Sequence, residues 1–170
     1  KSIIKRAINA NKVTINIHNI RDYSKDPHKK VDDYGFGGGA GMVLMPQPIF
    51  DAVDDLKTKD SKIILMTPQG IKYNQKMAYN LVNEKHLIVI CGHYEGFDER
   101  IRSIVDIELS IGDFVLTGGE IPAMVLVDSI ARYIPSVLGN NETTSEESFS
   151  NNLLEYPQYT RPQVWHGREV

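Results

Sequence analysis

The sequence has 170 residues, 41% hydrophobic and 24% charged, which is typical of one soluble globular domain with its own core. The longest apolar run, Leu87 to Cys91, is far too short to span a bilayer, and no signal peptide is visible. The net charge of −3 disfavours a protein that coats nucleic acid by charge alone, and the single cysteine excludes an internal disulfide. These features indicate an intracellular, cytoplasmic protein that does not act in a membrane.

Apolar periodicity predicts a helix and then a strand at the start of the chain. Apolar residues at helical spacing predict that Lys1 to Asn9 is the end of an amphipathic helix, and the alternation in 13–17 predicts a strand. Residues 21–33 are polar and are expected to form a loop. The next stretch, Tyr34 to Met42, contains five glycines in seven residues and cannot be a regular element. It lacks the Lys-Ser/Thr ending of a phosphate-binding loop, so its signal for a nucleotide is weak.

The middle of the chain alternates helices with strands. The pattern predicts a helix at Pro46–Leu56, a strand at Lys62–Met66 that runs into a turn at Thr67–Gly70, a helix at Gln75–Asn83 capped by Asn74, a strand at His86–Cys91, and a short helix around Ile101–Ile104. The strand at 86–91 is the most apolar of the chain, so it is expected to be central in the sheet.

The stretch from Asp106 to Pro122 organises the rest of the chain. A short strand is followed by a glycine-containing loop that closes at Gly118 and Gly119, and a helix over Ala123–Ile134 comes next. In an open α/β sheet, ligands bind outside the carboxyl ends of the strands, where this loop is expected. Residues 139–152 are polar and acidic and are typical of a linker.

The fold class predicted from these elements is α/β, with one mostly parallel sheet flanked by helices. Three strands end in polar, glycine-containing loops, at 67–70, 92–96 and 110–119. If these loops converge on one edge of the sheet, they form a cleft for a ligand.

Several long motifs resemble those of bacterial tRNA (guanine-37) methyltransferases, a family of the SPOUT class. The resemblance extends over nearly the whole chain and is carried by Val31–Asp33 before Gly37–Met42, by Pro68–Gly70, by Cys91–Arg100, by Ser110–Glu120 and by Tyr156–Pro162. It implies a deep C-terminal trefoil knot in the sheet, which composition and periodicity do not suggest, because knots are nearly absent from proteins.

The resemblance implies S-adenosylmethionine as the cofactor, bound in a bent form by the three loops. Backbone groups of the last loop are expected to hold the adenine, and the first two loops line the ribose and methionine side. The cofactor-binding residues that the resemblance implies are Pro68, Gly92, Tyr94, Glu95, Gly96, Ser110, Ile111, Gly112, Asp113, Phe114, Val115, Leu116, Gly118, Gly119 and Pro122.

The implied reaction transfers a methyl group to ring nitrogen 1 of guanosine 37 in tRNA, beside the anticodon. This nitrogen carries a proton at neutral pH, so a general base has to remove it while a cation steadies the charge on O6. The matching positions are Glu147 as the base and Arg132 as the cation. The family usually has Asp where this sequence has Glu147, and Glu146 is the alternative base. Glu95 is matched to a possible magnesium ion.

The resemblance also implies a homodimer whose active site is shared between the knot of one subunit and the linker of the other. Residues 1–138 are expected to form the catalytic domain without the family's first strand, and residues 139–170 the linker and the start of a helical tRNA-binding domain.

Two other functions stay open from the sequence. One is a dimerising fragment that binds the cofactor without turnover of its own. The other is a nucleotide-binding protein of another class, which uses Gly37 to Gly41 as a phosphate loop and would bind ATP or NAD.

Overall fold

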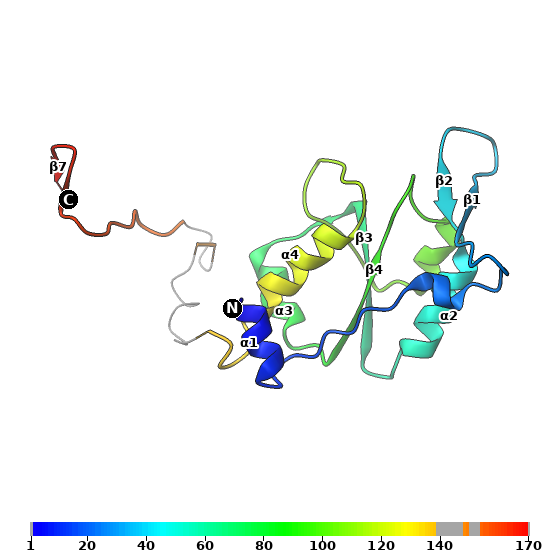
Figure 1. Cartoon of the computed structure of the whole chain (residues 1–170), viewed down its shortest axis with the longest axis horizontal. Helices are drawn as coiled ribbons and strands as arrows, with labels where there is room; N and C mark the ends of the chain where they lie inside the picture. Colours follow the sequence, from blue (N-terminus) through cyan, green and yellow to red (C-terminus); the bar gives the residue numbers. More distant parts are fainter. Residues whose placement is uncertain (1, 139–147, 150–153, 170) are drawn as a thin grey trace.

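The computed structural model describes residues 2–138, 148–149 and 154–169, and its centre is a three-stranded parallel sheet between helices (Figure 1). The strand order is β4-β3-β5, and both strand pairs are parallel. The elements in chain order are α1 (Ile3–Asn9), the 3₁₀ helix η1 (Ile20–Tyr23), β1 (Asp32–Tyr34), β2 (Met42–Leu44), α2 (Pro46–Leu56), β3 (Ser61–Lys72), α3 (Gln75–Leu81), β4 (His86–Cys91), the 3₁₀ helix η2 (Glu99–Ile104), β5 (Ile107–Ser110), α4 (Glu120–Ala131), β6 (Val164–Trp165) and β7 (Arg168–Glu169).

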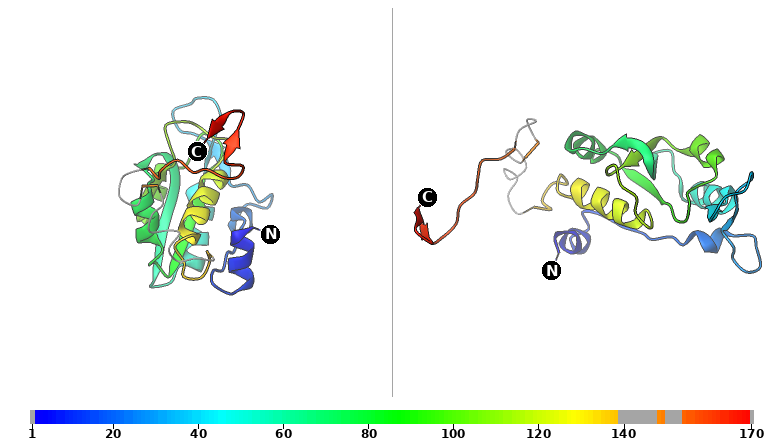
Figure 2. Two further views of the ribbon diagram at one scale, coloured as in Figure 1. Left: turned by 90° about the vertical axis from the view of Figure 1, so that its left-hand side faces the viewer. Right: turned by 90° about the horizontal axis from the view of Figure 1, so that it is seen from above.

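The central strand β3 divides the core into two layers, because successive side chains of a strand point to opposite faces. Ile63 and Leu65 pack on one face with buried residues of α2, and Ile64 and Met66 pack on the other face with residues of α3 and α4. Figure 2 shows the helices on the two sides of the sheet. The predicted α/β class with a parallel sheet is therefore confirmed, and the knot stays a prediction.

Two helices begin where the sequence predicts them, for local reasons. Pro46 stands at the first helical position of α2, where its missing N–H costs no hydrogen bond. The side chain of Asn74 accepts a hydrogen bond from the amide of Met77 at 3.1 Å, which caps α3. Both helices bury a small apolar face against the sheet, so these two predictions are confirmed.

The prediction that the strand at 86–91 is central is wrong. This strand is β4, which lies at the edge of the three-stranded sheet, while β3 lies between β4 and β5. β4 is hydrophobic because helices cover both faces of the sheet. They bury an edge strand on both faces just as they bury a central strand, so hydrophobicity does not distinguish the two positions.

The segment 13–17 is extended, but it does not form the predicted strand. Ile17 is 94% exposed, and residues 13–18 form no backbone–backbone hydrogen bond with any residue that the structure describes. Alternation of apolar residues favours extended backbone, whereas a strand also needs a neighbour to pair with.

The glycine-rich loop joins the two strands of an antiparallel hairpin, β1 and β2. The sequence did not predict these strands. The loop does not connect a strand to a helix, so it lacks the context of a phosphate-binding loop or of a dinucleotide fingerprint. At the other end of the chain, β6 and β7, which have two residues each, form a second antiparallel hairpin. Within the described ranges, no helix is long and apolar enough to cross a membrane.

The core position of Ile64 provides a test of this architecture. Ile64 is fully buried in the central strand, so Ile64→Ala is expected to lower the free energy of unfolding by about 2 to 5 kcal/mol. The same change at the exposed Ile17 is expected to cost less than about 0.5 kcal/mol. Urea unfolding of the two variants measures both values, and equal losses would contradict the assigned core.

Candidate functional site

Three loops and a hairpin project from the same end of the sheet, the carboxyl end of its parallel strands (Figure 1). Two of the loops follow β4 and β5, as the sequence predicts, and the third interrupts β3, which the sequence predicts to end at Met66. Their residues come from three separate parts of the chain, so the sheet topology alone brings them together.

The loop after β5 closes directly on the loop after β4. The amide of Gly119 donates to the carbonyl oxygen of Gly92 at 2.8 Å, and His93 pairs with Gly118 in an isolated antiparallel bridge. A Cβ atom on Gly119 would lie 2.7 Å from the backbone nitrogen of Gly92 and 2.8 Å from the Cα atom of Cys91. Only a residue without a side chain permits this approach.

The third loop is a four-residue bulge within β3, where the sequence predicts a turn. Met66 and Ile71 both pair with Leu109 of β5, so residues 67–70 are looped out of the ladder. Pro68 fits there because a bulged residue needs no ladder N–H. A Cβ atom on Gly70 would lie 2.5 Å from the backbone of Glu108 and Leu109, so β5 passes directly beside the bulge.

The β1–β2 hairpin docks beside the loop after β4. The amide of Glu95 donates to the carbonyl of Met42 at 3.1 Å, and the amide of Leu44 donates to the carbonyl of Gly96 at 2.9 Å. Sequence reasoning missed this contact, because the two segments are about fifty residues apart and neither carries a local signal for the other.

All fifteen residues of the predicted cofactor site lie at this end of the sheet. The residues that the structure places at this end of the sheet are Pro68, Gly92, Tyr94, Glu95, Gly96, Ser110, Ile111, Gly112, Asp113, Phe114, Val115, Leu116, Gly118, Gly119 and, in the first turn of α4, Pro122. Phe114 is 53% exposed and Val115 is 85% exposed, so these side chains are not part of the core. The groups of these loops that a ligand could contact closely are therefore backbone N–H and C=O groups.

The loop after β5 is held in shape by its own first residue. Ser110 is buried, and its hydroxyl donates to the carbonyl of Gly112 at 3.0 Å and accepts from the amide of Gly112 at 3.2 Å. Its backbone carbonyl accepts from the amide of Tyr73 at 2.8 Å. The start of the loop is thus fixed to the sheet.

Of the two predicted catalytic residues, the structure describes Arg132, which does not lie among these loops. Arg132 follows α4, which begins at Glu120 after the N-cap Gly119 and runs for 12 residues, so the helix carries it about 18 Å along its axis. Glu147, like its alternative Glu146, lies outside the described residues.

Burial raises the pKa of the Cys91 thiol to about 11, and the nearby carboxylate of Glu120 adds to this rise. Cys91 ends β4 directly before Gly92. The thiol is therefore protonated, and a poor nucleophile, at the carboxyl edge of the sheet at neutral pH.

No group of three or more His, Cys, Asp or Glu residues that could hold a metal ion occurs in the part of the chain that the structure describes. Glu95 is exposed and is the carboxylate that the sequence matched to magnesium. A single exposed carboxylate does not by itself make a metal site, so the described residues give the magnesium prediction no support.

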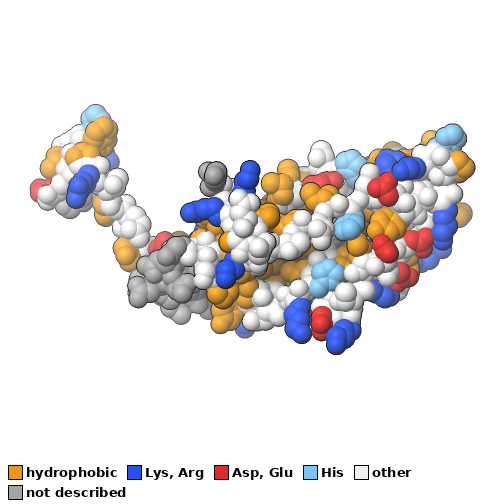
Figure 3. All heavy atoms as spheres, turned by 60° about the horizontal axis from the view of Figure 1, so that its bottom comes forward, with side chains coloured by type: hydrophobic (Ala, Val, Ile, Leu, Met, Phe, Trp, Pro, Cys, Tyr) orange, Lys and Arg blue, Asp and Glu red, His pale blue; other side chains and the backbone are white. Residues whose placement is uncertain are grey.

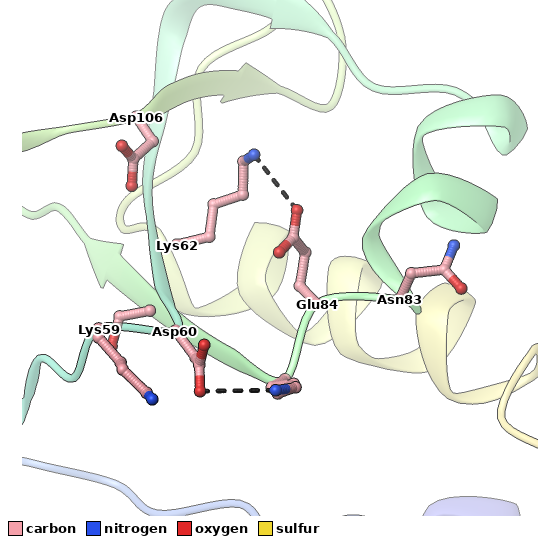
Figure 4. Close-up of a pocket in the computed structure, with 8 residues that line it drawn as sticks. Lys59, Asp60, Lys62, Asn83, Glu84 and Asp106 are labelled. Atoms are coloured by element: carbon pink, nitrogen blue, oxygen red, sulfur yellow. Dashed lines mark ion pairs between the residues drawn. The ribbon is translucent and has the colours of Figure 1, made fainter.

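A polar hollow of about 340 Å³ lies at the opposite, amino end of the strands (Figure 4). Its charged residues are largely paired, with Lys62 3.2 Å from Glu84 and Lys85 3.7 Å from Asp60. Ligands of parallel sheets bind at the carboxyl ends of the strands, so we do not assign the functional site to this hollow.

Comparison with known proteins decides the family. A family model described as tRNA (Guanine-1)-methyltransferase TrmD matches residues 1–170. The chain belongs to this methyltransferase family. Curated relatives named tRNA (guanine-N(1)-)-methyltransferase include proteins of Dictyoglomus turgidum, 54% identical over 169 residues, and Halalkalibacterium halodurans, 57% identical over 173 residues. Another, from Malacoplasma penetrans, is 57% identical over 169 residues.

These matches cover 99% of this chain and 69%, 70% and 74% of the three relatives, in the order given. The methyltransferase family is a SPOUT family, so the resemblance drawn from the motifs is confirmed. The match runs through both the sheet and the C-terminal residues, and not only through the glycine loops.

The contact between Gly119 and Gly92 predicts the effect of one added methyl group. Gly119→Ala is expected to lower the free energy of unfolding by about 1 to 3 kcal/mol, because the new Cβ atom meets backbone that cannot rotate away. Gly35→Ala is the matched control, since its Cβ atom would lie 3.6 Å from Val43 in ordinary contact. Thermal unfolding measures both variants, and an unchanged midpoint for Gly119→Ala would contradict the close approach.

Proposed function

We propose that this chain transfers a methyl group from S-adenosylmethionine to ring nitrogen 1 of guanosine 37 in tRNA. The observation that carries the proposal is the family match over all 170 residues together with the glycine-lined loops at the carboxyl edge of the sheet. A methyltransferase of this family needs a methyl donor and a tRNA substrate. The identity of the donor, the position of the guanosine and the residue roles are the steps that we add.

The loop cluster fits a donor that carries an adenine. The loops after β4 and β5 present backbone donors and acceptors at Gly92, Gly96 and residues 111–119, and a backbone-lined site can read the edge of a base without polar side chains. Gly119 and Gly92, which meet through a backbone hydrogen bond of 2.8 Å, place no side chain of their own at this junction of the two loops. When bound, S-adenosylmethionine supplies a sulfonium methyl group, which is the electrophile.

The chain's own residues supply the proton transfer and the charge stabilisation. Glu147 takes the proton from nitrogen 1 of the guanine, and the nitrogen's electron pair then attacks the methyl carbon. The bond between that carbon and the donor's sulfur breaks in the same step, its electron pair stays on sulfur, and the donor leaves as the neutral thioether. Arg132 donates to O6, where negative charge builds up as the proton leaves. The neutral thiol of Cys91 does not compete with the guanine for the methyl group, because only a thiolate is a good nucleophile.

The length and the composition of α4 support a homodimer with a shared site. Ile121, Met124 and Val125 lie at helical spacing and are 55%, 69% and 42% exposed, so α4 has an uncovered apolar side besides its buried one. Hydrophobic side chains also reach the surface in Figure 3. If two copies pack through α4 about a twofold axis, the far end of one helix, with Arg132, can serve the loops of the partner.

The same proposal divides the chain into a catalytic part and a linker. Residues 1–138 carry the donor site, and residues 139–170 begin the connection that brings Glu147 to the partner's site. Magnesium stays a prediction, and no step of the proposed reaction passes through it.

The proposal is tested by calorimetric titration and by methyl transfer. S-adenosylmethionine is expected to bind saturably while ATP does not bind, and the full-length protein is expected to methylate a tRNA with guanosine 37 and to leave a tRNA with adenosine 37 unmodified. Binding of the donor without any transfer by the full-length protein would favour a binding module. Binding of ATP alone would favour a nucleotide-binding protein.

The base assignment predicts a separation of binding from chemistry. Glu147→Gln removes the proton acceptor but keeps the size of the side chain, so the rate of transfer is expected to fall by about 100-fold or more. The dissociation constant of S-adenosylmethionine is expected to stay unchanged in calorimetry. Glu146→Gln is the matched control, and a larger loss in that variant would move the base to Glu146.

The dimer assignment predicts the effect of a charge on the uncovered side of α4. Met124→Glu is expected to convert the dimer to a monomer in analytical ultracentrifugation, because a buried unpaired carboxylate is strongly unfavourable in an interface. Asn80→Glu places the same carboxylate on an exposed position of α3 and is expected to leave the dimer intact. A dimer that survives Met124→Glu would show that another surface holds it.

A further inference from the structure

Arg21 connects an early segment of the chain to the loop after β4. Its Nη2 atom donates to the hydroxyl oxygen of Tyr94 at 3.3 Å, across 73 residues of sequence. Its Nη1 atom donates to the backbone carbonyl of Lys29 at 3.1 Å. None of the roles assigned so far uses this side chain, although Tyr94 belongs to the candidate donor site.

Tyr94 has an unusual conformation that needs support. Its φ angle is 62°, in the left-handed region that bulky side chains rarely adopt, and its side chain is 44% exposed. Its ring lies 4.8 Å from the ring of His93, measured between centroids. A residue in such a conformation persists when several neighbours hold it, and here the neighbours are the His93 ring at one side and the Arg21 guanidinium at the hydroxyl.

Arg21 is itself well fixed, and by neutral groups. Its amide donates to the side-chain oxygen of Asn19 at 3.0 Å, which anchors the start of η1, and its side chain reaches Lys29 and Tyr94. In the described part of the chain, no carboxylate forms an ion pair with Arg21, in contrast to Lys29, which pairs with Asp22 at 2.9 Å. A planar guanidinium can bridge two acceptors in fixed directions, which a lysine ammonium cannot do as well.

We propose that Arg21 is a positioning residue for the methyl-donor site, acting through the hydroxyl of Tyr94. It holds the ring of Tyr94 against His93, and therefore beside the bridge between His93 and Gly118 that closes the two loops. This inference rests on the proposed function. It assigns to η1 a part in donor binding, although η1 lies outside the three loops.

The test is a double-mutant cycle on the full-length protein. Arg21→Gln is expected to weaken S-adenosylmethionine binding roughly threefold to tenfold in calorimetry, which lies within the range for the net contribution of one ordinary intramolecular hydrogen bond. Tyr94→Phe removes the same hydrogen bond and is expected to have a similar effect. Because the two side chains act through one bond, the double variant is expected to be no weaker than either single variant.

Steady-state kinetics add a measurement that a merely structural role would not reproduce. In Arg21→Gln, the KM for S-adenosylmethionine is expected to rise while kcat and the KM for tRNA stay unchanged. Arg21→Lys is expected to be intermediate, since it keeps the charge but loses the fixed bridge. Arg6→Gln, an exposed arginine change on α1, is the matched control and is expected to bind the donor as the parent does.

Three results would overturn the inference. Unchanged donor affinity in Arg21→Gln would show that Tyr94 does not need this support, and effects that multiply in the double variant would show that Arg21 acts independently of Tyr94. A rise in the KM for tRNA that persists in the Tyr94→Phe background would assign Arg21 to the RNA instead. If the parent protein itself does not bind S-adenosylmethionine, the proposed function is wrong as well. Titration of the parent protein alone shows this before any variant is made.

Discussion

The backbone contact between Gly119 and Gly92 is the constraint on which the candidate site depends. The hydrogen bond of 2.8 Å brings the loop after β5 onto the loop after β4, and a side chain on Gly119 would prevent it. The same contact fixes where α4 begins, because Gly119 is its N-cap residue. The position of the helix, the floor of the site and the arrangement of the two loops therefore have one common cause.

The central strand β3 contributes to both the core and the candidate site. Residues before its bulge pack in the core, and the bulge itself lies at the site. Before the bulge, side chains of β3 alternate between two buried layers. At the bulge, the ladder with β5 is interrupted, because Met66 and Ile71 share Leu109 as their partner, and four residues leave the sheet. A regular strand would have continued the core, whereas the bulge places Pro68 and Gly70 at the carboxyl edge beside the other loops.

The length of α4 bears on the proposed assembly. A helix that starts in the site and runs about 18 Å carries Arg132 away from the loops of its own subunit. The exposed apolar residues of the helix offer a surface for a second copy. The proposed role of Arg132 therefore depends on the proposed dimer, because only the loops of a second copy bring a substrate to the end of α4.

The sequence by itself determined the local elements. The helix at 46–56, the cap at Asn74, the strand at 86–91 and the three glycine-containing loops depend on hydrophobic periodicity, on proline and glycine and on capping side chains, which act within a few residues. The motifs also identified the family, because they are long and retain their order along the chain.

Only the tertiary structure decided how these pieces meet. It placed β4 at an edge, left 13–17 extended without a paired strand, turned the predicted turn at 67–70 into a bulge, and brought Arg21 to Tyr94. Each of these features depends on which backbone groups find partners far away in the chain. Local periodicity does not contain that information, since a strand shows the same alternation and an arginine the same chemistry whether or not a distant partner lies beside it.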